Sequence, residues 1–182
     1  MKLENKVAFI MGGTSGIGLE TTKLFREQGA RIAVIGSNAK RLQEAQKHLR
    51  GEALTVLADL RKVADIERAV EETRTKSGRI DVVFANAGAG TVKPLEAVTP
   101  QDIEDSVALN FSGAFFTIQK TAPLIPKGGS IIVTTSFLDT VGIPGLSILS
   151  ATKAAVRSLV RTLGAELATR YSRERRQPWN DL

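Results

Sequence analysis

Residues 6–18, KVAFIMGGTSGIG, join a short apolar run to a glycine-rich turn, and this stretch decides the fold. Near-continuous apolar runs are typical of strands buried in a parallel sheet, and Val7–Met11 is such a run. The next residues follow a helical pattern with one apolar face, formed by Ile17, Thr21, Leu24 and Phe25. The stretch therefore predicts a strand, a tight turn and a helix, in that order.

The glycines of the turn suit phosphate binding. Gly12 lets the chain leave the strand sharply, Gly16 lets backbone approach a pyrophosphate without a Cβ in the way, and Gly18 lets the helix pack close to the strand. The first N–H groups of the helix would point at the anion. The spacing is G-x-x-x-G-x-G, not G-x-G-x-x-G, so from spacing alone an ordinary tight turn stays open.

Composition indicates one globular domain and excludes several kinds of site. The chain has 182 residues, of which 42% are hydrophobic and 24% charged, which is ordinary for a globular protein. It has no cysteine, which excludes disulfides and thiolate metal sites. His48 is the single histidine, so histidine clusters are excluded too, and we predict no metal site.

Charge and hydropathy bear on partners and location. The net charge of +6 raises nucleic acid as a partner, but basic residues alternate with acidic ones along polar helix faces, so we expect none. No apolar stretch approaches the roughly 20 residues of a membrane span. The N-terminal apolar run belongs to the first strand and does not resemble a signal peptide. We expect a cytoplasmic protein without membrane contact.

Apolar and polar segments alternate along the whole chain. Strands are predicted over 7–11, 31–35, 53–58, 81–85 and 129–135. Helices are predicted over 17–28, 39–49, 63–76, 100–122 and 147–169. This alternation predicts an α/β fold, a Rossmann-type doubly wound parallel sheet with helices on both faces. Ligands bind such sheets beyond the carboxyl ends of the strands, which here are Gly12, Gly36, Asp59, Asn86 and Ser136.

Several motifs in this order resemble the short-chain dehydrogenase/reductase family. They are Gly12-x-x-x-Gly16-x-Gly18, Asp59-Leu60, Asn86-Ala-Gly88, Asn110, and Ser136 followed by Ala151-Thr-Lys153. The resemblance covers about residues 5–169. It implies an NAD(P)-dependent oxidoreductase that acts on a small carbonyl or alcohol substrate. It also implies a possible homo-oligomer that assembles through the helices at 100–122 and 147–169.

The resemblance implies a cofactor site spread over the strand ends. Its residues would be Gly12, Thr14, Ser15, Gly16, Ile17, Gly18, Ser37, Asn38, Arg41, Asp59, Leu60, Asn86, Ala87, Gly88 and Lys153. Asp59 and Leu60 would contact the adenine, although a plain strand-ending loop stays open. The second strand ends in Gly-Ser-Asn, without the carboxylate that commonly binds the ribose 2′-hydroxyl of NAD. We therefore predict NADP, with NAD as the alternative; Lys40 and Arg41 fit a phosphate or a plain helix surface.

The family's catalytic set of Asn, Ser, Tyr and Lys is incomplete here. Asn110, Ser136 and Lys153 match, but Leu149 stands at the tyrosine position, and the single tyrosine of the chain is Tyr171. A leucine has no proton to exchange with a substrate oxygen, and losing a general acid typically lowers the rate by about 10² to 10⁴. We predict impaired activity. Ser147 or Ser150 acting through a water is a weaker alternative, because neither shares the side-chain direction of position 149.

Two further readings stay open beside the impaired enzyme. The chain could be a non-catalytic homologue that binds a dinucleotide or a partner, or a truncated product without function. Residues 170–182, RYSRERRQPWNDL, support the last, because relatives continue with a strand reading like GIRVNAVSPG. We therefore expect one domain over 1–169, a non-family tail over 170–182, and a sheet that lacks its last one or two strands.

A shift of reading frame near codon 170 accounts for this tail. Codons can be chosen for residues 170–181 that, read one base later, encode Gly-Ile-Arg-Val-Asn-Ala-Val-Ser-Pro-Gly-Thr, the expected family text. The leucine at 149 is a separate event, since no single base change converts a tyrosine codon to a leucine codon.

The nucleotide sequence around codon 170 tests this inference. We expect the frame one base later to encode the glycine-to-threonine strand given above. A gene in which no alternative frame encodes that strand would show that the tail has another origin.

Overall fold

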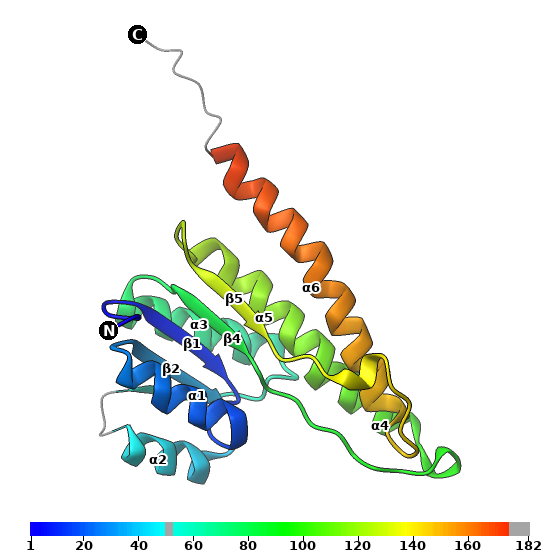
Figure 1. Ribbon diagram of the computed structural model, residues 1–182. Helices are drawn as coiled ribbons and strands as arrows, with labels where there is room; N and C mark the ends of the chain where they lie inside the picture. The colour runs from blue at the N-terminus through cyan, green and yellow to red at the C-terminus, as the bar shows by residue number, and fades with distance from the viewer. Residues whose placement is uncertain (50–52, 175–182) are drawn as a thin grey trace.

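The computed structural model describes residues 1–49 and 53–174, with side chains to 168, and its centre is a parallel sheet (Figure 1). The strands are β1 (Val7–Met11), β2 (Arg31–Gly36), β3 (Leu54–Leu57), β4 (Val82–Ala85) and β5 (Ser130–Val133). They lie in the order β3-β2-β1-β4-β5, and all neighbours pair in parallel. The order reverses between β1 and β4, as a doubly wound fold requires, which confirms the predicted fold class.

Helices cover both faces of the sheet. They are α1 (Gly16–Glu27), α2 (Ala39–His48), α3 (Val63–Ser77), α4 (Pro100–Ser106), α5 (Gly113–Thr121) and α6 (Ser147–Glu174). Side chains alternate along β1: Ala8 and Ile10 join the core under α1 and α2, whereas Phe9 and Met11 join the core under α3 and α5. The near-continuous apolar strand is therefore buried on both faces, as its sequence indicates.

A buried carboxylate joins the amino ends of the strands. Asp81, 1% exposed, accepts hydrogen bonds from the Val7 N–H at 2.9 Å, from Arg79 at 2.6 and 2.9 Å and from Lys6 at 3.3 Å. Burial alone raises the pKa of the Asp81 carboxyl, but the hydrogen bonds from Arg79, Val7 and Lys6 outweigh it and hold the pKa below its ordinary value. This pairing fixes β1 against β4 at the end opposite the glycine turn.

Two predicted helices differ from those observed. The single helix predicted over 100–122 is divided by a π-helical turn, Val107–Ser112, between α4 and α5. Such single turns are rare and often lie at functional sites, and hydrophobic period does not reveal them. The helix predicted over 147–169 continues to Glu174, so the first residues of the predicted tail are helical. The rest of that tail, 175–182, lies outside the described residues.

The predicted apolar face of α1 is wrong at two of its four residues, although Phe25 does pack against the core. Ile17 is 68% and Leu24 is 52% exposed, whereas Gly18 and Thr22 are buried. A Cβ on Gly18 would collide with the Gly12 carbonyl oxygen and lie 2.7 Å from Asn86 Nδ2. The helix approaches the strand ends so closely that only small side chains fit between them, and apolar periodicity selects the larger residues instead.

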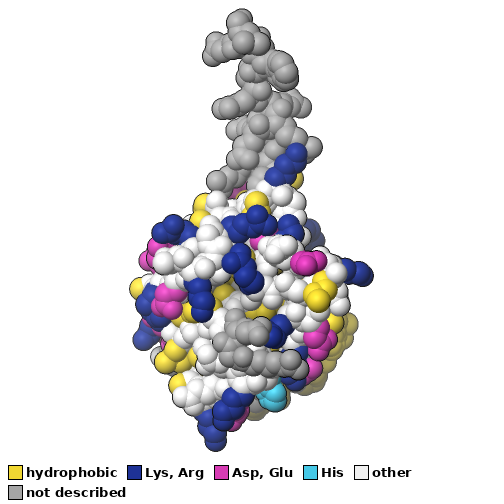
Figure 2. All heavy atoms as spheres, turned by 90° about the vertical axis from the view of Figure 1, so that its left-hand side faces the viewer, with side chains coloured by type: hydrophobic (Ala, Val, Ile, Leu, Met, Phe, Trp, Pro, Cys, Tyr) yellow, Lys and Arg dark blue, Asp and Glu magenta, His cyan; other side chains and the backbone are white. Residues whose placement is uncertain are grey.

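The described residues show a surface of mixed charge and no helix suited to a membrane. On the face shown in Figure 2, Lys and Arg side chains are interspersed with Asp and Glu. In the described part of the chain, no helix is both long enough and apolar enough to cross a bilayer.

Replacing Asp81 with alanine tests the strand-end pairing. The Val7 N–H would lose a buried acceptor, so we expect the free energy of unfolding to fall by about 2 kcal/mol at about pH 7. Urea denaturation measures this, with Glu104→Ala, an exposed acid on α4, as the matched control.

The stability difference between the wild type and Asp81→Ala should depend on pH. Since the folded pKa of Asp81 lies below the ordinary 3.8, its contribution is complete above that pH and is lost as pH falls through the folded value. An Asp81→Ala protein as stable as the wild type at neutral pH would contradict the role given to this carboxylate.

Candidate functional site

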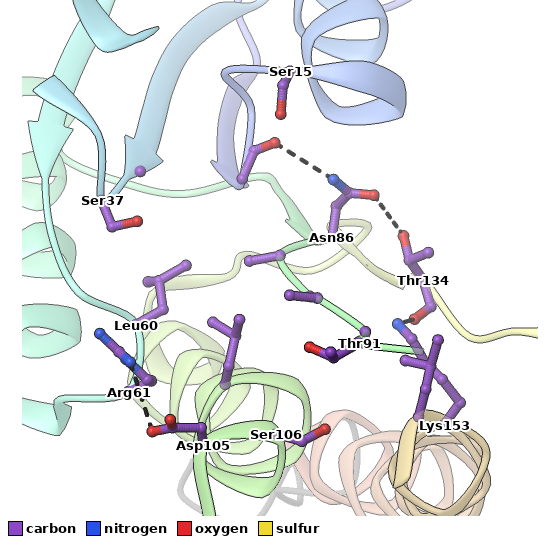
Figure 3. A pocket seen from close by; sticks show the side chains of 18 of the residues that line it. Ser15, Ser37, Leu60, Arg61, Asn86, Thr91, Asp105, Ser106, Thr134 and Lys153 are labelled. Carbon is purple, nitrogen blue, oxygen red and sulfur yellow. Dashed lines mark hydrogen bonds and ion pairs between the residues drawn. The ribbon is translucent and has the colours of Figure 1, made fainter. Parts of the chain in front are cut away.

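A cleft of about 750 Å³ opens at the carboxyl ends of the strands. Residues at or just after the ends of the five strands meet along it; they are Gly12, Gly36, Asp59, Asn86 and Ser136. Its volume is typical of small-molecule sites, and its position is the point of strand-order reversal that the fold predicts for a ligand. Figure 3 shows side chains from several elements converging on it.

The glycine turn forms one wall of the cleft with its backbone. Gly12 has φ +68°, and a Cβ there would lie 2.9 Å from Ala87 Cα, so only glycine fits. Gly16 has φ +50°, and a Cβ there would meet no atom within 4 Å. Ser15 precedes α1 without a side-chain hydrogen bond to its first amides. Those amides, with the positive end of the helix dipole, suit a phosphate.

A short hydrogen-bonded chain links three strand ends. Asn86 Nδ2 donates to the Gly12 carbonyl at 3.5 Å, and Thr134 Oγ1 donates to Asn86 Oδ1 at 2.9 Å (Figure 3). The Thr134 carbonyl in turn accepts from Lys153 Nζ at 2.8 Å. The ends of β1, β4 and β5 are thus held at fixed spacing, together with a side chain from α6.

The end of β2 presents small and basic side chains. Ser37, Asn38 and Arg41 are exposed and line the cleft. Asn38 Oδ1 accepts from the Arg41 N–H at 3.0 Å, so this amide caps α2. Among the described residues, the Arg41 side chain forms no ion pair, and its guanidinium is available to a ligand.

The end of β3 includes a residue that the sequence reasoning missed. Asp59 and Leu60, which were predicted to contact adenine, line the cleft, but Arg61 lines it too and donates to both oxygens of Asp59. The hydrogen bond from Arg61 holds the pKa of the Asp59 carboxyl below its ordinary value. The sequence feature that could have identified Arg61 is a basic residue directly after Asp59-Leu60.

Asn110 lies behind the cleft wall and does not line it. Its Nδ2 donates to the Ala89 carbonyl and its Oδ1 accepts from the Ala89 N–H, both at 2.9 Å. Nδ2 also lies 3.1 Å from Ser106 Oγ and 3.2 Å from Thr152 Oγ1. The side chain of this π-helical residue therefore fixes the turn after β4 against α4 and α6, which makes Asn110 a positioning residue in this geometry.

Ser136 and Lys153 both line the cleft. Ser136 Oγ accepts from the Leu138 N–H at 3.2 Å, which leaves its own O–H free to donate into the cleft. Lys153 is 9% exposed, and burial lowers the pKa of its ammonium below the ordinary value. Together they place a hydroxyl donor and a desolvated ammonium at one end of the cleft.

Leu149 lies one helical turn before Lys153 and also lines the cleft. Its side chain packs on Gly90, where a Cβ would lie 2.5 Å from Leu149 Cδ2. Ser150 Oγ donates to the Leu138 carbonyl at 2.5 Å, so this hydroxyl is already engaged in the fold. Ser147 is absent from the described lining of the cleft. An apolar side chain thus occupies the wall beside Ser136 and Lys153.

A second ion pair at the cleft was also missed. Lys93 Nζ lies 2.7 and 2.6 Å from the oxygens of Asp102, which caps α4 together with Thr99. The hydrogen bonds from Lys93 and Thr99 lower the pKa of Asp102 to about 2. The ion pair holds the loop after β4 against α4. No local sequence pattern predicts that Lys93 and Asp102 pair.

The predicted residues therefore fall into two groups. Of those predicted to bind cofactor or act in catalysis, Gly16, Gly18 and Asn110 do not line the cleft, and the others do. Gly18 serves the close packing of α1, and Asn110 holds backbone that borders the cleft. Within the described part of the chain, no three His, Cys, Asp or Glu side chains cluster in a way that could hold a metal.

Comparisons with known proteins agree with this arrangement. The family model for short chain dehydrogenases matches residues 6–171. Oxidoreductase asL5 of Sarocladium schorii is 38% identical over 91% of this chain and 68% of its own. The 3-oxoacyl-[acyl-carrier-protein] reductase FabG of Thermotoga maritima is 34% identical over 95% of this chain and 72% of its own. The hydroxynaphthalene reductase arp2 of Aspergillus fumigatus is matched over 62% of its length at 32% identity.

Solved structures show the same fold. A dehydrogenase/reductase from Sinorhizobium meliloti superposes with a TM-score of 0.89 at 33% identity, over 93% of this chain and 69% of that one. A short chain dehydrogenase from Burkholderia cenocepacia in complex with NADP gives the same TM-score at 27% identity, over 93% and 71%. With its glycine turn, its strand-end cleft and its serine and lysine in place, the chain belongs to the short chain dehydrogenase family of oxidoreductases.

Proposed function

We propose that the cleft binds a nicotinamide dinucleotide, with its pyrophosphate over the glycine turn. The observation that carries this is the backbone wall at Gly12, which lines the cleft and where a Cβ would lie 2.9 Å from Ala87 Cα. The uncapped start of α1 supplies amide donors for the phosphates. Lys153, at the other end of the cleft, would donate to ribose hydroxyls.

The end of β2 favours NADP over NAD. Ser37 and Asn38 stand there instead of a carboxylate, so nothing at this position repels a 2′-phosphate. Arg41 brings a guanidinium without an ion-pair partner among the described residues. The NADP complex of the Burkholderia cenocepacia structure supports the same choice.

The reaction that this site supports is hydride transfer to or from a small carbonyl or alcohol. The dinucleotide, when bound, supplies or accepts the hydride. The Ser136 hydroxyl donates a hydrogen bond to the substrate oxygen, and that oxygen must also gain or lose a proton. Leu149 lines the wall where a proton donor would stand, and it has no proton to give. We therefore propose an oxidoreductase site whose proton-transfer step is impaired.

A non-catalytic role is the second candidate. The observation that favours it is the packing of Leu149 on Gly90, which closes this wall with an apolar contact. Such a site would hold a dinucleotide for regulation or partner binding without turnover. The reading as a truncated product without function, like the cytoplasmic location, stays a prediction from the sequence.

We further propose that the chain forms a homo-oligomer through its long helices. α6 packs beside α4 and the π-helical turn and extends beyond the body of the molecule (Figure 1). Val160 on α6 is 38% exposed, and a Cβ on Gly164 would meet nothing within 4 Å, so this part of α6 is open to a second helix.

Ser37→Asp tests the cofactor preference. A carboxylate here repels a 2′-phosphate and accepts from a ribose 2′-hydroxyl, so we expect the Kd for NADP to rise by about tenfold or more and the Kd for NAD to fall. Calorimetry measures both. Ser158→Asp, which adds the same charge to an exposed position on α6 away from the cleft, is the matched control. A wild-type chain that binds neither dinucleotide would refute the proposed site.

Leu149→Tyr tests the chemistry. With a phenol one turn from Lys153, we expect NADPH oxidation with a small carbonyl substrate to rise by about 10² to 10⁴ over the wild type. Leu149→Phe, which brings the ring without the hydroxyl, is the control and should stay at the wild-type rate. Equal and robust turnover by the wild type and Leu149→Tyr would show that the missing hydroxyl does not limit the reaction.

A further inference from the structure

Arg61 lines the cleft but belongs to none of the motifs described above. It follows Leu60 in the loop after β3 and lies beside Leu60 at the cleft, with Asp105 of α4 beyond it (Figure 3). This is the end of the cleft that Ser37 also lines. The side chain is 48% exposed, so a large part of it faces open space.

One edge of the Arg61 guanidinium is hydrogen-bonded to Asp59, and the other faces Asp105. Nε donates to Asp59 Oδ1 and Nη2 to Asp59 Oδ2, both at 2.9 Å. The backbone N–H of Arg61 also donates to Asp59 Oδ1, at 3.1 Å. On the other side, Nη1 lies 3.7 Å from Asp105 Oδ1. Two carboxylates thus hold the planar group at the cleft and neutralise its charge.

This arrangement disfavours phosphate binding by Arg61. Asp59 takes two of the five guanidinium N–H donors, and a phosphate at the remaining edge would meet the negative charge of both carboxylates. The flat face of the guanidinium makes none of these contacts and stays open to a ligand. Such faces stack on aromatic rings.

No other residue that lines the cleft is as well suited as Arg61 to stack on an aromatic ring. None of the described residues that line the cleft is aromatic. Leu60 is 5% exposed and offers little surface, and Ser37 is too small to cover a ring. Arg41, in contrast, has no ion-pair partner in the described part of the chain and suits a phosphate. The two arginines therefore differ in what they can bind.

We propose that Arg61 is a specificity-determining residue whose guanidinium face, held by Asp59 and Asp105, stacks on the adenine ring of the dinucleotide. The inference rests on the proposed dinucleotide site. It adds that the adenine is recognised by the planar guanidinium of Arg61, whose charge is balanced by the two carboxylates. Arg41 would bind the 2′-phosphate.

Fragments of the cofactor separate this role from a general loss of binding. We expect Arg61→Ala to weaken binding of 2′,5′-ADP, the adenine half, by about 3- to 30-fold, and to leave the Kd for nicotinamide mononucleotide unchanged. Arg61→Lys keeps the positive charge without the planar group, and it should bind 2′,5′-ADP as weakly as Arg61→Ala. Arg61→Tyr keeps a plane without the charge and should restore most of the affinity. Arg74→Ala removes an exposed, ion-paired arginine that does not line the cleft and is the matched control.

A spectroscopic readout reports stacking itself. Binding of 2′,5′-ADP to the wild type and to Arg61→Tyr should reduce the adenine absorbance, and binding to Arg61→Lys should not. If the wild type binds 2′,5′-ADP and Arg61→Lys binds it equally well, the stacking role is wrong and the dinucleotide site stands. If the wild type binds neither NADP nor 2′,5′-ADP, both proposals fail.

Discussion

The close approach of backbone at the end of β1 is the constraint on which the rest of the site depends. The Gly12 carbonyl touches Gly18 at the start of α1 and accepts from Asn86 after β4, and a Cβ on Gly12 would collide with Ala87. No side chain larger than hydrogen fits at Gly12 or Gly18 without moving a neighbouring strand or helix. This contact brings the start of α1 to the switch point of the sheet, and from there the Asn86–Thr134–Lys153 chain extends the same spacing across the cleft.

The two ends of the cleft differ in what they retain. At the glycine turn and the ends of β2 and β3, the chain keeps the backbone donors, Arg41 and Arg61, to which we assign the phosphates and the adenine in our proposal. At the other end, Ser136 and Lys153 both line the cleft, but the isobutyl group of Leu149 lines it beside them where a proton donor would be needed. The proposed binding and the proposed chemistry are therefore separable, because binding would use the backbone of many residues whereas proton transfer would depend on one side chain.

Much of the fold could be predicted from local sequence, and so could the residues at the strand ends. Apolar runs and glycines locate strands and turns, since a parallel sheet buried on both faces leaves few other arrangements. The inward face of α1 could not be predicted, because the space left by Gly12 selects small residues and Ile17 faces outward. The π-helical turn around Asn110 was also missed, because the distant contact with Ala89, and not helical periodicity, engages that side chain.

The sequence alone determined the family, the order of strands and helices, and the absence of a tyrosine at position 149, because these are properties of residue type and spacing along the chain. Only the tertiary structure decided which groups are free to act. It showed that Asn110 and Ser150 are engaged in holding backbone, and that Asp59 is paired with Arg61. The physical reason is that hydrogen-bonding capacity is shared between partners from different elements, and a donor already used by the fold is lost to a ligand.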